Sequence, residues 1–320
     1  MEAFLISMII AATPVLLAGL GELVAERSGV LNLGVEGMML MGAVAAFATA
    51  STLGSTPLAI LVGAGAGMVM ALIFAVLSIS LMANQAATGL ALTIFGIGAS
   101  GLVGQGFVGQ ALEPLPKLAI PWLSDGTVLG RILFGHDAMV YLAVGAAAAI
   151  AWFLSRTRPG LSLRAVGDNP ESAHALGLGV IRTRYLATMF GGAMAGLGGA
   201  YLSLAYTPMW GENMTAGRGW IALALVVFAT WRPGRLVAGA LLFAAIDILQ
   251  FYAGSVDAAV CGRAPFLCVG DAFMTILPAQ FLSMLPYVAT IVALVLISRN
   301  VALTKANAPA SIGKPFRASS

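Results

Sequence analysis

The stretch Gly160–Arg184, GLSLRAVGDNPESAHALGLGVIRTR, is a long polar break between apolar segments. Together with Arg156 and Arg158 just before it, this stretch accounts for five of the sixteen lysine and arginine residues of the chain. In a chain this apolar, a polar, helix-forming segment is expected to lie in water, where a soluble partner can contact it. We therefore predict that Gly160–Arg184 lies outside a membrane that the neighbouring segments cross.

The composition is typical of a membrane protein. Hydrophobic residues make up 60% of the chain and charged residues 9%, against about 25% charged residues in soluble domains. The chain also contains 39 glycines, and small residues are common where membrane helices touch. We expect an all-α polytopic protein in contact with membrane lipid. The net charge of +3, with basic residues at segment ends, does not indicate nucleic acid as a partner.

A helix that spans a membrane needs about 20 mostly apolar residues. The sequence predicts about nine such spans, within a range of eight to ten, and glycine or proline interrupts several of them. The predicted spans are 4–24, 35–53, 57–82, 87–110, 137–155, 185–206, 217–231, 235–254 and 280–298. The N-terminus lacks the basic residues that open a signal peptide, so we interpret it as the start of the first span. A cleaved signal peptide is the alternative.

The basic residues predict the orientation, because cytoplasmic loops carry more lysine and arginine than external loops. With residues 156–184 in the cytoplasm, eleven basic residues lie inside and four outside, and Arg27 at the end of the first span is left open. The N-terminus is then outside and the C-terminus inside. Residues 1–298 form the transmembrane domain, with 156–184 as its cytoplasmic loop. The polar tail 299–320 is expected to be a disordered cytoplasmic segment.

Two external loops follow from this orientation, 111–136 and 255–279. The second loop carries Cys261 and Cys268, the two cysteines of the chain. An oxidising exterior would allow a disulfide between them. Two reduced thiols are the alternative, because the sequence does not give the distance between the sulfur atoms.

The sequence lacks the motifs of common catalytic sites. It contains no GxxxxGK[ST] segment, no HExxH segment, and no cysteine and histidine set at metal-binding spacing. Two GxGxxG patterns, at 96–101 and 104–109, lie inside an apolar span, where they indicate close helix packing instead of a dinucleotide site. We therefore expect that the chain is not an enzyme and that it binds neither a cofactor nor a metal.

The segment 21–42, GELVAERSGVLNLGVEGMMLMG, places charged and amide side chains between apolar runs. An unpaired charge at bilayer depth costs about 2.5–3.5 kcal/mol, so Glu26, Asn32 and Glu36 need partners or water. One interpretation is a cytoplasmic loop. The other is a broken helix whose polar turn enters the membrane beside a pathway, with the carboxylates paired or capping the half-helices.

Asp247 is a lone acid in the middle of the eighth predicted span. An ionisable residue at that depth is a functional candidate, and the alternative is a hydrogen bond that fixes helix packing. A polar stripe at the start of the fourth predicted span, with the same two interpretations, consists of Asn84, Gln85, Thr88 and Thr93. The candidates for a polar pathway are Glu26, Asn32, Glu36, Thr88, Thr93 and Asp247.

The polar break contains the signals of a short helix. Asn169 can cap a helix, Pro170 suits the first helical position, and Glu171 suits the positive end of the helix dipole. Gly177 is typical of a helix end. The sequence therefore predicts a two-turn helix within 168–178 that lies across the cytoplasmic face. A surface helix with no partner is the alternative.

At these residues the chain resembles the permeases of ABC importers. Residues 171–177, ESAHALG, are similar to the EAAxxxG loop of those permeases, in which a short cytoplasmic helix fits a groove on the ATPase. Residues 164–180, RAVGDNPESAHALGLGV, resemble more closely the branched-chain amino acid and simple-sugar permease family. Residues 26–40, ERSGVLNLGVEGMML, are similar to the branch of that family associated with nucleosides or simple sugars.

The resemblance implies an assembly at the bacterial plasma (inner) membrane. It would contain a second permease subunit, as a homodimer or a heterodimer, two cytoplasmic ATP-binding subunits that hold ATP and Mg²⁺, and an extracytoplasmic substrate-binding protein. The implied contacts with the ATPase are Arg164, Asn169, Pro170, Glu171, Ala173 and Gly177. Ser172 stands where the motif has a second alanine, and the Leu-Pro pair that follows many such loops is absent. These departures leave the docking geometry open.

The resemblance also implies a function, the import of nucleosides or related simple sugars without covalent chemistry by this chain. Branched-chain amino acid import is the alternative within the family. An ion-coupled secondary transporter, with Asp247 as the titrating group, is the alternative outside it, and it leaves the polar break without a role. The missing catalytic motifs oppose an intramembrane enzyme.

Overall fold

The computed structural model describes residues 2–118, 128–261 and 307–317, together with Met284, Val288, Ile291, Val292 and Val295. This part of the chain is helical, and its only extended pairings are isolated bridges. The predicted all-α fold is therefore confirmed. Within the described residues, the helices long and apolar enough to cross a membrane are Glu2–Arg27, Val35–Leu53, Thr56–Ser80, Gln85–Phe107 and Ala138–Arg156.

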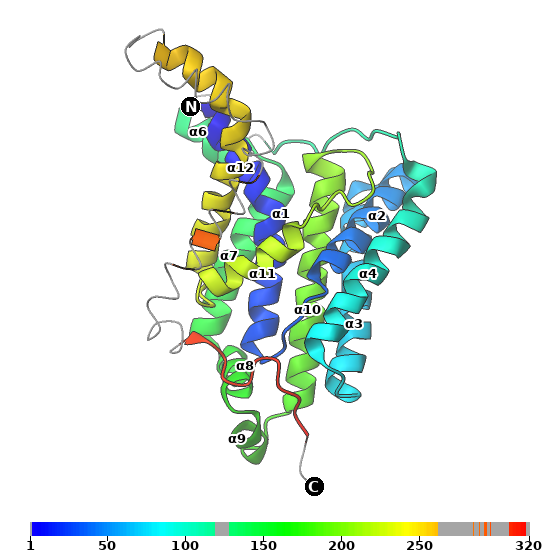
Figure 1. Ribbon diagram of the computed structural model, residues 1–320, viewed down its shortest axis with the longest axis vertical. Coiled ribbons are helices and arrows are strands. Elements are labelled where there is room, and N and C mark those ends of the chain that lie inside the picture. Colours follow the sequence, from blue (N-terminus) through cyan, green and yellow to red (C-terminus); the bar gives the residue numbers. More distant parts are fainter. Residues whose placement is uncertain are drawn as a thin grey trace.

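Long helices form a bundle that runs between two ends of the molecule (Figure 1). They are α1 (Glu2–Arg27), α2 (Val35–Leu53), α3 (Thr56–Ala75), α4 (Gln85–Gly104), α7 (Ala138–Arg156), α10 (Val180–Tyr201) and α12 (Pro233–Cys261). The shorter helices are α6 (Val128–Phe134), α8 (Arg158–Asp168), α9 (Pro170–Ala175) and α11 (Arg218–Phe228). Turns of π-helix extend α3 over Val76–Ser80 and α10 over Leu202–Tyr206, and a 3₁₀ turn, Gln105–Phe107, follows α4.

Glycines let α10 sit at the centre of the bundle, against α1, α2 and α3. A Cβ atom on Gly42 of α2 would lie 2.5 Å from the Cα atom of Gly196, and a Cβ atom on Gly21 of α1 would lie 2.7 Å from the carbonyl oxygen of Gly191. Real Cβ atoms do not come so close, so these helix pairs need glycine at the contact. The high glycine content therefore serves close packing of these helices.

The seventh predicted span, 217–231, is wrong. Its helix α11 has 11 residues, which at 1.5 Å per residue is about 16 Å, against about 30 Å of hydrocarbon in a membrane. The eighth span is longer than predicted, because α12 continues to Cys261 through residues assigned to an external loop. Five described positions of the ninth span, between Met284 and Val295, are helical.

The two ends of the bundle carry different parts of the chain. Helices α8 and α9 and residues 307–317 lie at one end, and the N-terminus lies at the other (Figure 1). The expectation of a disordered tail is wrong for 307–317, where Ser311 and Phe316 are buried. The predicted pairing of Cys261 with Cys268 falls outside the described residues, because Cys268 is not among them.

Candidate functional site

Helix α9 forms at the predicted place and for the predicted reasons. The Asn169 side-chain oxygen accepts a hydrogen bond from the backbone N–H of Ser172 at 2.9 Å, and Pro170 is the first helical residue. Gly177 follows with φ +80°, a conformation that costs glycine little and other residues more. The helix covers Pro170–Ala175, so it is somewhat shorter than the predicted 168–178.

The side chains of α9 divide into one that packs and several that face away from the bundle. Ala173 is buried against Val166, Val180 and Phe316. The exposed residues are Glu171, Ser172, His174, Ala175 and Leu176. Leu176 is 81% exposed at the end of a water-facing helix, where a large apolar side chain is available to a partner. We call these five residues the outer face of α9.

The predicted ATPase contacts differ in their exposure, and some of them are buried or half-buried in the structure. Asn169, Glu171 and Gly177 are exposed, Pro170 is half-buried, and the Ala173 side chain is a packing contact inside the protein. Arg164 lies on α8, half-buried, near enough to Arg27 to interact electrostatically with it. These residues therefore mark one end of the bundle, but only part of the set can meet a partner.

The second region of interest is the connection Ser28–Gly34 between α1 and α2, which we call the inner loop. Three side chains of α1 and α4 bind its backbone: Gln85 accepts an N–H at 2.8 Å, Glu22 accepts another at 3.1 Å, and the Thr93 hydroxyl donates to a carbonyl at 3.0 Å. Thr93 lies eight residues from the start of α4, about 12 Å along the helix. Asn32 is fully buried. The inner loop therefore enters the bundle, as the broken-helix interpretation predicts.

Glu36 connects the start of α2 to the start of α11 in the interior of the bundle. It lies in the first turn of α2, and its carboxylate accepts hydrogen bonds from the Thr215 hydroxyl and from the N–H groups of Gly217 and Gly219. These groups precede and open α11, whose positive dipole end a carboxylate stabilises. A Cβ atom on Gly219 would lie 2.6 Å from the Glu36 Cα atom, so glycine permits the approach. Glu36 therefore caps a half-helix, one of the two roles predicted for it.

Glu26 and Arg27 hold the other end of α11. The Trp231 indole N–H donates to the Glu26 carboxylate, and the Arg27 guanidinium donates to the Trp231 carbonyl oxygen at 3.0 Å. Thr230 and Trp231 both have positive φ, 49° and 54°, so this turn is held in an uncommon conformation. Helix α11 thus runs from Glu36 inside the bundle to the end of α1.

The six pathway candidates do not form one group. Glu26, Asn32, Glu36 and Thr93 are buried and bonded to protein atoms, so they support the inner loop and α11. Thr88 on α4 and Asp247 on α12 are half-buried, and α4 and α12 lie on opposite sides of α10 in Figure 1. Four further residues take part in these contacts and are not among the predicted site residues: Glu22, Gln85, Thr215 and Trp231.

The sequence contains a signal for two of these residues, because Gln85 belongs to the polar stripe of the fourth predicted span and Glu22 to the segment 21–42. Glu22 and Glu26 are four apart, so they share a helix face. The partners of Glu36 and Glu26 on the α11 side lie 179 and 205 residues away in the sequence. Such distant pairs leave no local pattern, so a single sequence does not predict them.

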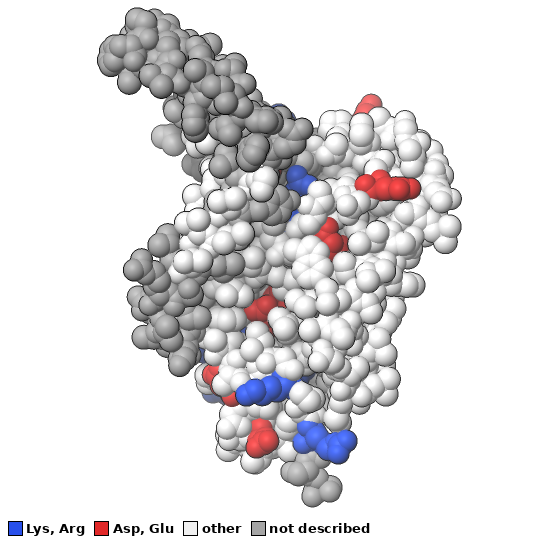
Figure 2. Space-filling view, in the orientation of Figure 1, with Lys and Arg blue, Asp and Glu red and all other residues white. Residues whose placement is uncertain are grey.

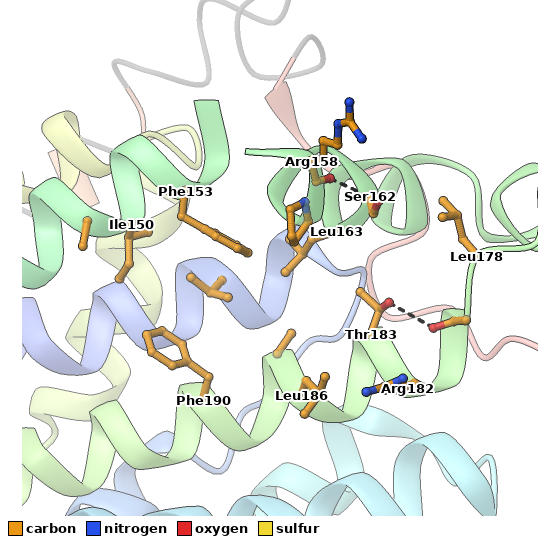
Figure 3. A pocket seen from close by; sticks show the side chains of 15 residues that line it. Ile150, Phe153, Arg158, Ser162, Leu163, Leu178, Arg182, Thr183, Leu186 and Phe190 are labelled. Atoms are coloured by element: carbon orange, nitrogen blue, oxygen red, sulfur yellow. Dashed lines mark hydrogen bonds between the residues drawn. The ribbon is translucent and has the colours of Figure 1, made fainter. Parts of the chain in front are cut away.

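A cavity of about 790 Å³ opens between α7, α8 and α10, near the end that carries α9. Figure 3 shows apolar side chains around it, among them Ile150, Phe153 and Phe190. The hydroxyl groups in its wall, on Ser162 and Thr183, bond to the backbone of their own helices. The residues that line the cavity include none of the six pathway candidates and none of the inner loop. The cavity is therefore separate from the inner loop.

The fold and these two regions define a class, a polytopic helical membrane protein with a broken-helix core and a short helix at one end. The family model described as "Branched-chain amino acid transport system / permease component" matches residues 4–294. This match covers most of the chain, so the chain belongs to that permease family. The family membership predicted from residues 26–40 and 164–180 is therefore confirmed.

Three relatives are similar over nearly their whole length. "Putative glucose ABC transporter permease protein TsgC13" of Haloferax volcanii is 44% identical over 289 residues, 89% of this chain and 88% of that protein. The guanosine ABC transporter permease protein NupQ of Bacillus subtilis is 31% identical, with 95% and 93% covered. The nucleoside ABC transporter permease protein NupC of Lactococcus lactis is 32% identical, with 98% and 96% covered. The chain is thus similar to both sugar and nucleoside permeases.

Proposed function

We propose that this chain is the membrane subunit of an ATP-driven importer for nucleosides or related simple sugars. The observation that carries the proposal is the full-length similarity to permeases named for glucose, guanosine and nucleosides. Branched-chain amino acids appear in the family description, but not in the names of these three relatives. Nucleosides and sugars are therefore the preferred solute class.

The outer face of α9 is the proposed docking surface for the ATP-binding subunit. Glu171, Ser172 and His174 offer polar contacts there, and Leu176 offers an apolar contact. ATP and Mg²⁺ bind the partner, and this chain contributes no catalytic group. Nucleotide-driven movement of α9 then shifts the equilibrium between outward-open and inward-open arrangements of the bundle.

In the proposed orientation, the end with α8 and α9 is cytoplasmic and the N-terminus is external. Figure 2 supports this orientation, because the basic side chains visible on that face gather mainly at the α8 and α9 end. Arg27 and Arg184 at this end bind backbone carbonyls of residues 307–317, so in the proposed orientation that segment is cytoplasmic as well. The substrate-binding protein delivers solute at the opposite end.

A second permease subunit and lipid share the outer surface of the bundle. Helices α3 and α4 expose many large apolar side chains, including Leu61, Ile94 and Leu102, each at least 68% exposed. Such a surface is suited to lipid or to a partner helix. Whether the second subunit is a copy of this chain or a sister chain is decided by co-purification.

In this proposal the buried polar residues Glu26, Asn32, Glu36 and Thr93, which we call the frame, hold the inner loop and α11 in place. Glu36 fixes the start of α11 to the start of α2, and Glu26 fixes the end of α11 to α1. Two half-helices held in this way can move as one unit when the bundle switches. Thr88 and Asp247, which stand outside this frame, remain the proposed polar groups of the solute pathway.

Reconstitution tests the proposed function directly. Vesicles that contain the permease, its ATP-binding subunit and its substrate-binding protein are loaded with ATP and supplied with labelled guanosine or glucose. We expect uptake that requires ATP and the ATP-binding subunit. Uptake by the permease alone along an ion gradient would instead identify an ion-coupled carrier, and ATP-dependent uptake of leucine would identify an amino acid importer.

A further inference from the structure

Residues Asn307–Arg317, which we call the tail segment, run along the end of the bundle that carries α8 and α9 (Figure 1). The N–H and the hydroxyl of Ser311 both donate to the Gly167 carbonyl oxygen of α8, at 3.0 and 2.6 Å. The N–H of Gly313 donates to the Gly29 carbonyl oxygen in the inner loop at 3.1 Å. The tail segment therefore bonds to both α8 and the inner loop.

Arg184 is the point where these contacts meet. It is 1% exposed, although it belongs to the polar break that the sequence places outside the membrane. Its guanidinium donates to the Ser28 carbonyl of the inner loop at 3.2 Å, to the Lys314 carbonyl at 3.0 Å and to the Ser311 hydroxyl at 3.2 Å. One side chain of α10 thus ties the inner loop to the tail segment, with charge-assisted hydrogen bonds.

The contact with α9 is apolar. Phe316 is buried in a cluster with Ala173 of α9, Val166 of α8 and Val180 of α10. Its ring also meets the His174 ring of α9 edge to face, with the centroids 5.7 Å apart. Phe316 lies two residues from Lys314, whose carbonyl Arg184 binds. Phe316 thus links α9, through the backbone of the tail segment, to the carbonyl that Arg184 binds.

The groups around Arg184, Ser311 and Gly29 are closely packed. Gly29 has φ +90°, and a Cβ atom there would lie 2.9 Å from the Arg184 guanidinium and closer still to the Ser311 hydroxyl. Tightly packed groups pass on a displacement instead of absorbing it. The broken-helix core and α9 are thus joined by a close-packed connection.

We propose that the tail segment is a coupling element, in which Phe316, Ser311 and Arg184 are positioning residues that carry the movement of α9 to the inner loop. The proposal rests on the proposed function, because it assigns the path by which the ATP-binding subunit drives the bundle. It goes beyond docking, since it predicts that binding of the ATP-binding subunit and coupling to transport can be separated by substitution.

The experiment compares variants of the full-length permease in the reconstituted complex. Phe316→Ala removes the contact with α9, and Ser311→Ala removes hydroxyl bonds at α8 and Arg184. Arg317→Ala, on the exposed side of the same segment, is the matched control. Labelled guanosine or glucose uptake and ATP hydrolysis are measured in the same vesicles, together with the amount of ATP-binding subunit retained.

We expect Phe316→Ala and Ser311→Ala to retain the ATP-binding subunit but to move roughly fivefold less solute per ATP hydrolysed, in the usual range for loss of coupling between sites. Phe316→Leu, which keeps a large apolar side chain, should restore most of the coupling, and Arg317→Ala should match the wild type.

Unchanged uptake per ATP in both Phe316→Ala and Ser311→Ala would overturn the proposal. If Phe316→Ala fails to bind the ATP-binding subunit, Ser311→Ala decides, because Ser311 bonds to α8 and α10 and not to α9. A wild-type complex without ATP-dependent uptake would refute the proposed function itself, which is a separate result.

Discussion

The outer face of α9 and the inner loop with α11 are both polar segments in an apolar chain, but they use their polar groups in opposite ways. On α9 the polar side chains are exposed, and the small Ala173 packs inward. In the inner loop and at Glu36 the polar groups point inward and bond to the backbone. The exposed polar groups of α9 are therefore available to a partner, whereas the buried polar groups of the inner loop and Glu36 stabilise the fold.

This comparison predicts how substitutions divide between stability and assembly. An exposed side chain contributes little to the free energy of unfolding, whereas a buried carboxylate with several donors contributes much, because its removal leaves those donors unpaired. Variants in the frame should unfold more easily, and variants on the outer face of α9 should lose the partner.

Glu36→Ala has the largest expected effect. It leaves the N–H groups of Gly217 and Gly219 and the Thr215 hydroxyl without their acceptor, so we expect a loss of about 3 kcal/mol in the free energy of unfolding, as for buried hydrogen bonds to a charged group. Thermal unfolding of the detergent-solubilised protein measures the loss. Glu212→Ala, at an exposed acid, is the control, and equal stability of the two variants would contradict the capping role of Glu36.

Trp231→Phe should have an intermediate effect. It removes the indole donor to Glu26 but keeps a large aromatic ring, and an unpaired buried acceptor costs about 1–2 kcal/mol. The same unfolding measurement applies, with Trp152→Phe on the exposed side of α7 as the matched control. A Trp231→Phe variant as stable as Trp152→Phe would show that the Glu26 bond does not hold the end of α11.

Asn169→Ala should act mainly on α9 itself. Loss of a helix cap costs about 1 kcal/mol, and a helix of only six residues has few other bonds to compensate. We expect weaker retention of the ATP-binding subunit in pull-down experiments, while the melting temperature of the permease changes little. Asn169→Asp, which preserves an acceptor for the Ser172 N–H, should bind as the wild type does, and equally weak binding by both variants would exclude the cap as the cause.

Glu171→Lys should have the smallest effect on stability, within about 0.5 kcal/mol, because the side chain is exposed. It reverses the charge of the outer face of α9, so co-purification of the ATP-binding subunit and ATP-dependent uptake should both fall. The control is Arg317→Ala, an exposed charge change nearby. Survival of both binding and uptake in Glu171→Lys would remove the outer face from the docking surface.

The sequence predicts features that depend on neighbouring residues. Helix α9 follows from Asn169, Pro170 and Gly177 because capping, proline geometry and a glycine end act over a single turn. The long spans follow from hydropathy, and close helix packing from glycine. The charged residues at Glu26 and Glu36 mark the broken helix, because a membrane protein retains buried charge only with partners.

Features that depend on distant pairs could not be predicted in this way. Residues 217–231 are apolar enough for a span, and only the contact of Gly217 and Gly219 with Glu36 explains why α11 starts inside the bundle. The tail segment looks polar and irregular, but Arg184, Gly167 and Gly29 provide its bonding partners. Arg184 belongs to the polar break that the sequence places outside the membrane, and its burial depends on those same residues.

The most direct test is the accessibility of Ser172→Cys on α9, in a protein whose two native cysteines are replaced by serine. A membrane-impermeant maleimide should leave this cysteine unmodified in intact cells. It should label the cysteine in inverted vesicles that lack the ATP-binding subunit, and bound ATP-binding subunit should protect it. Labelling in intact cells would place α9 outside the cell and contradict its role as the cytoplasmic docking helix.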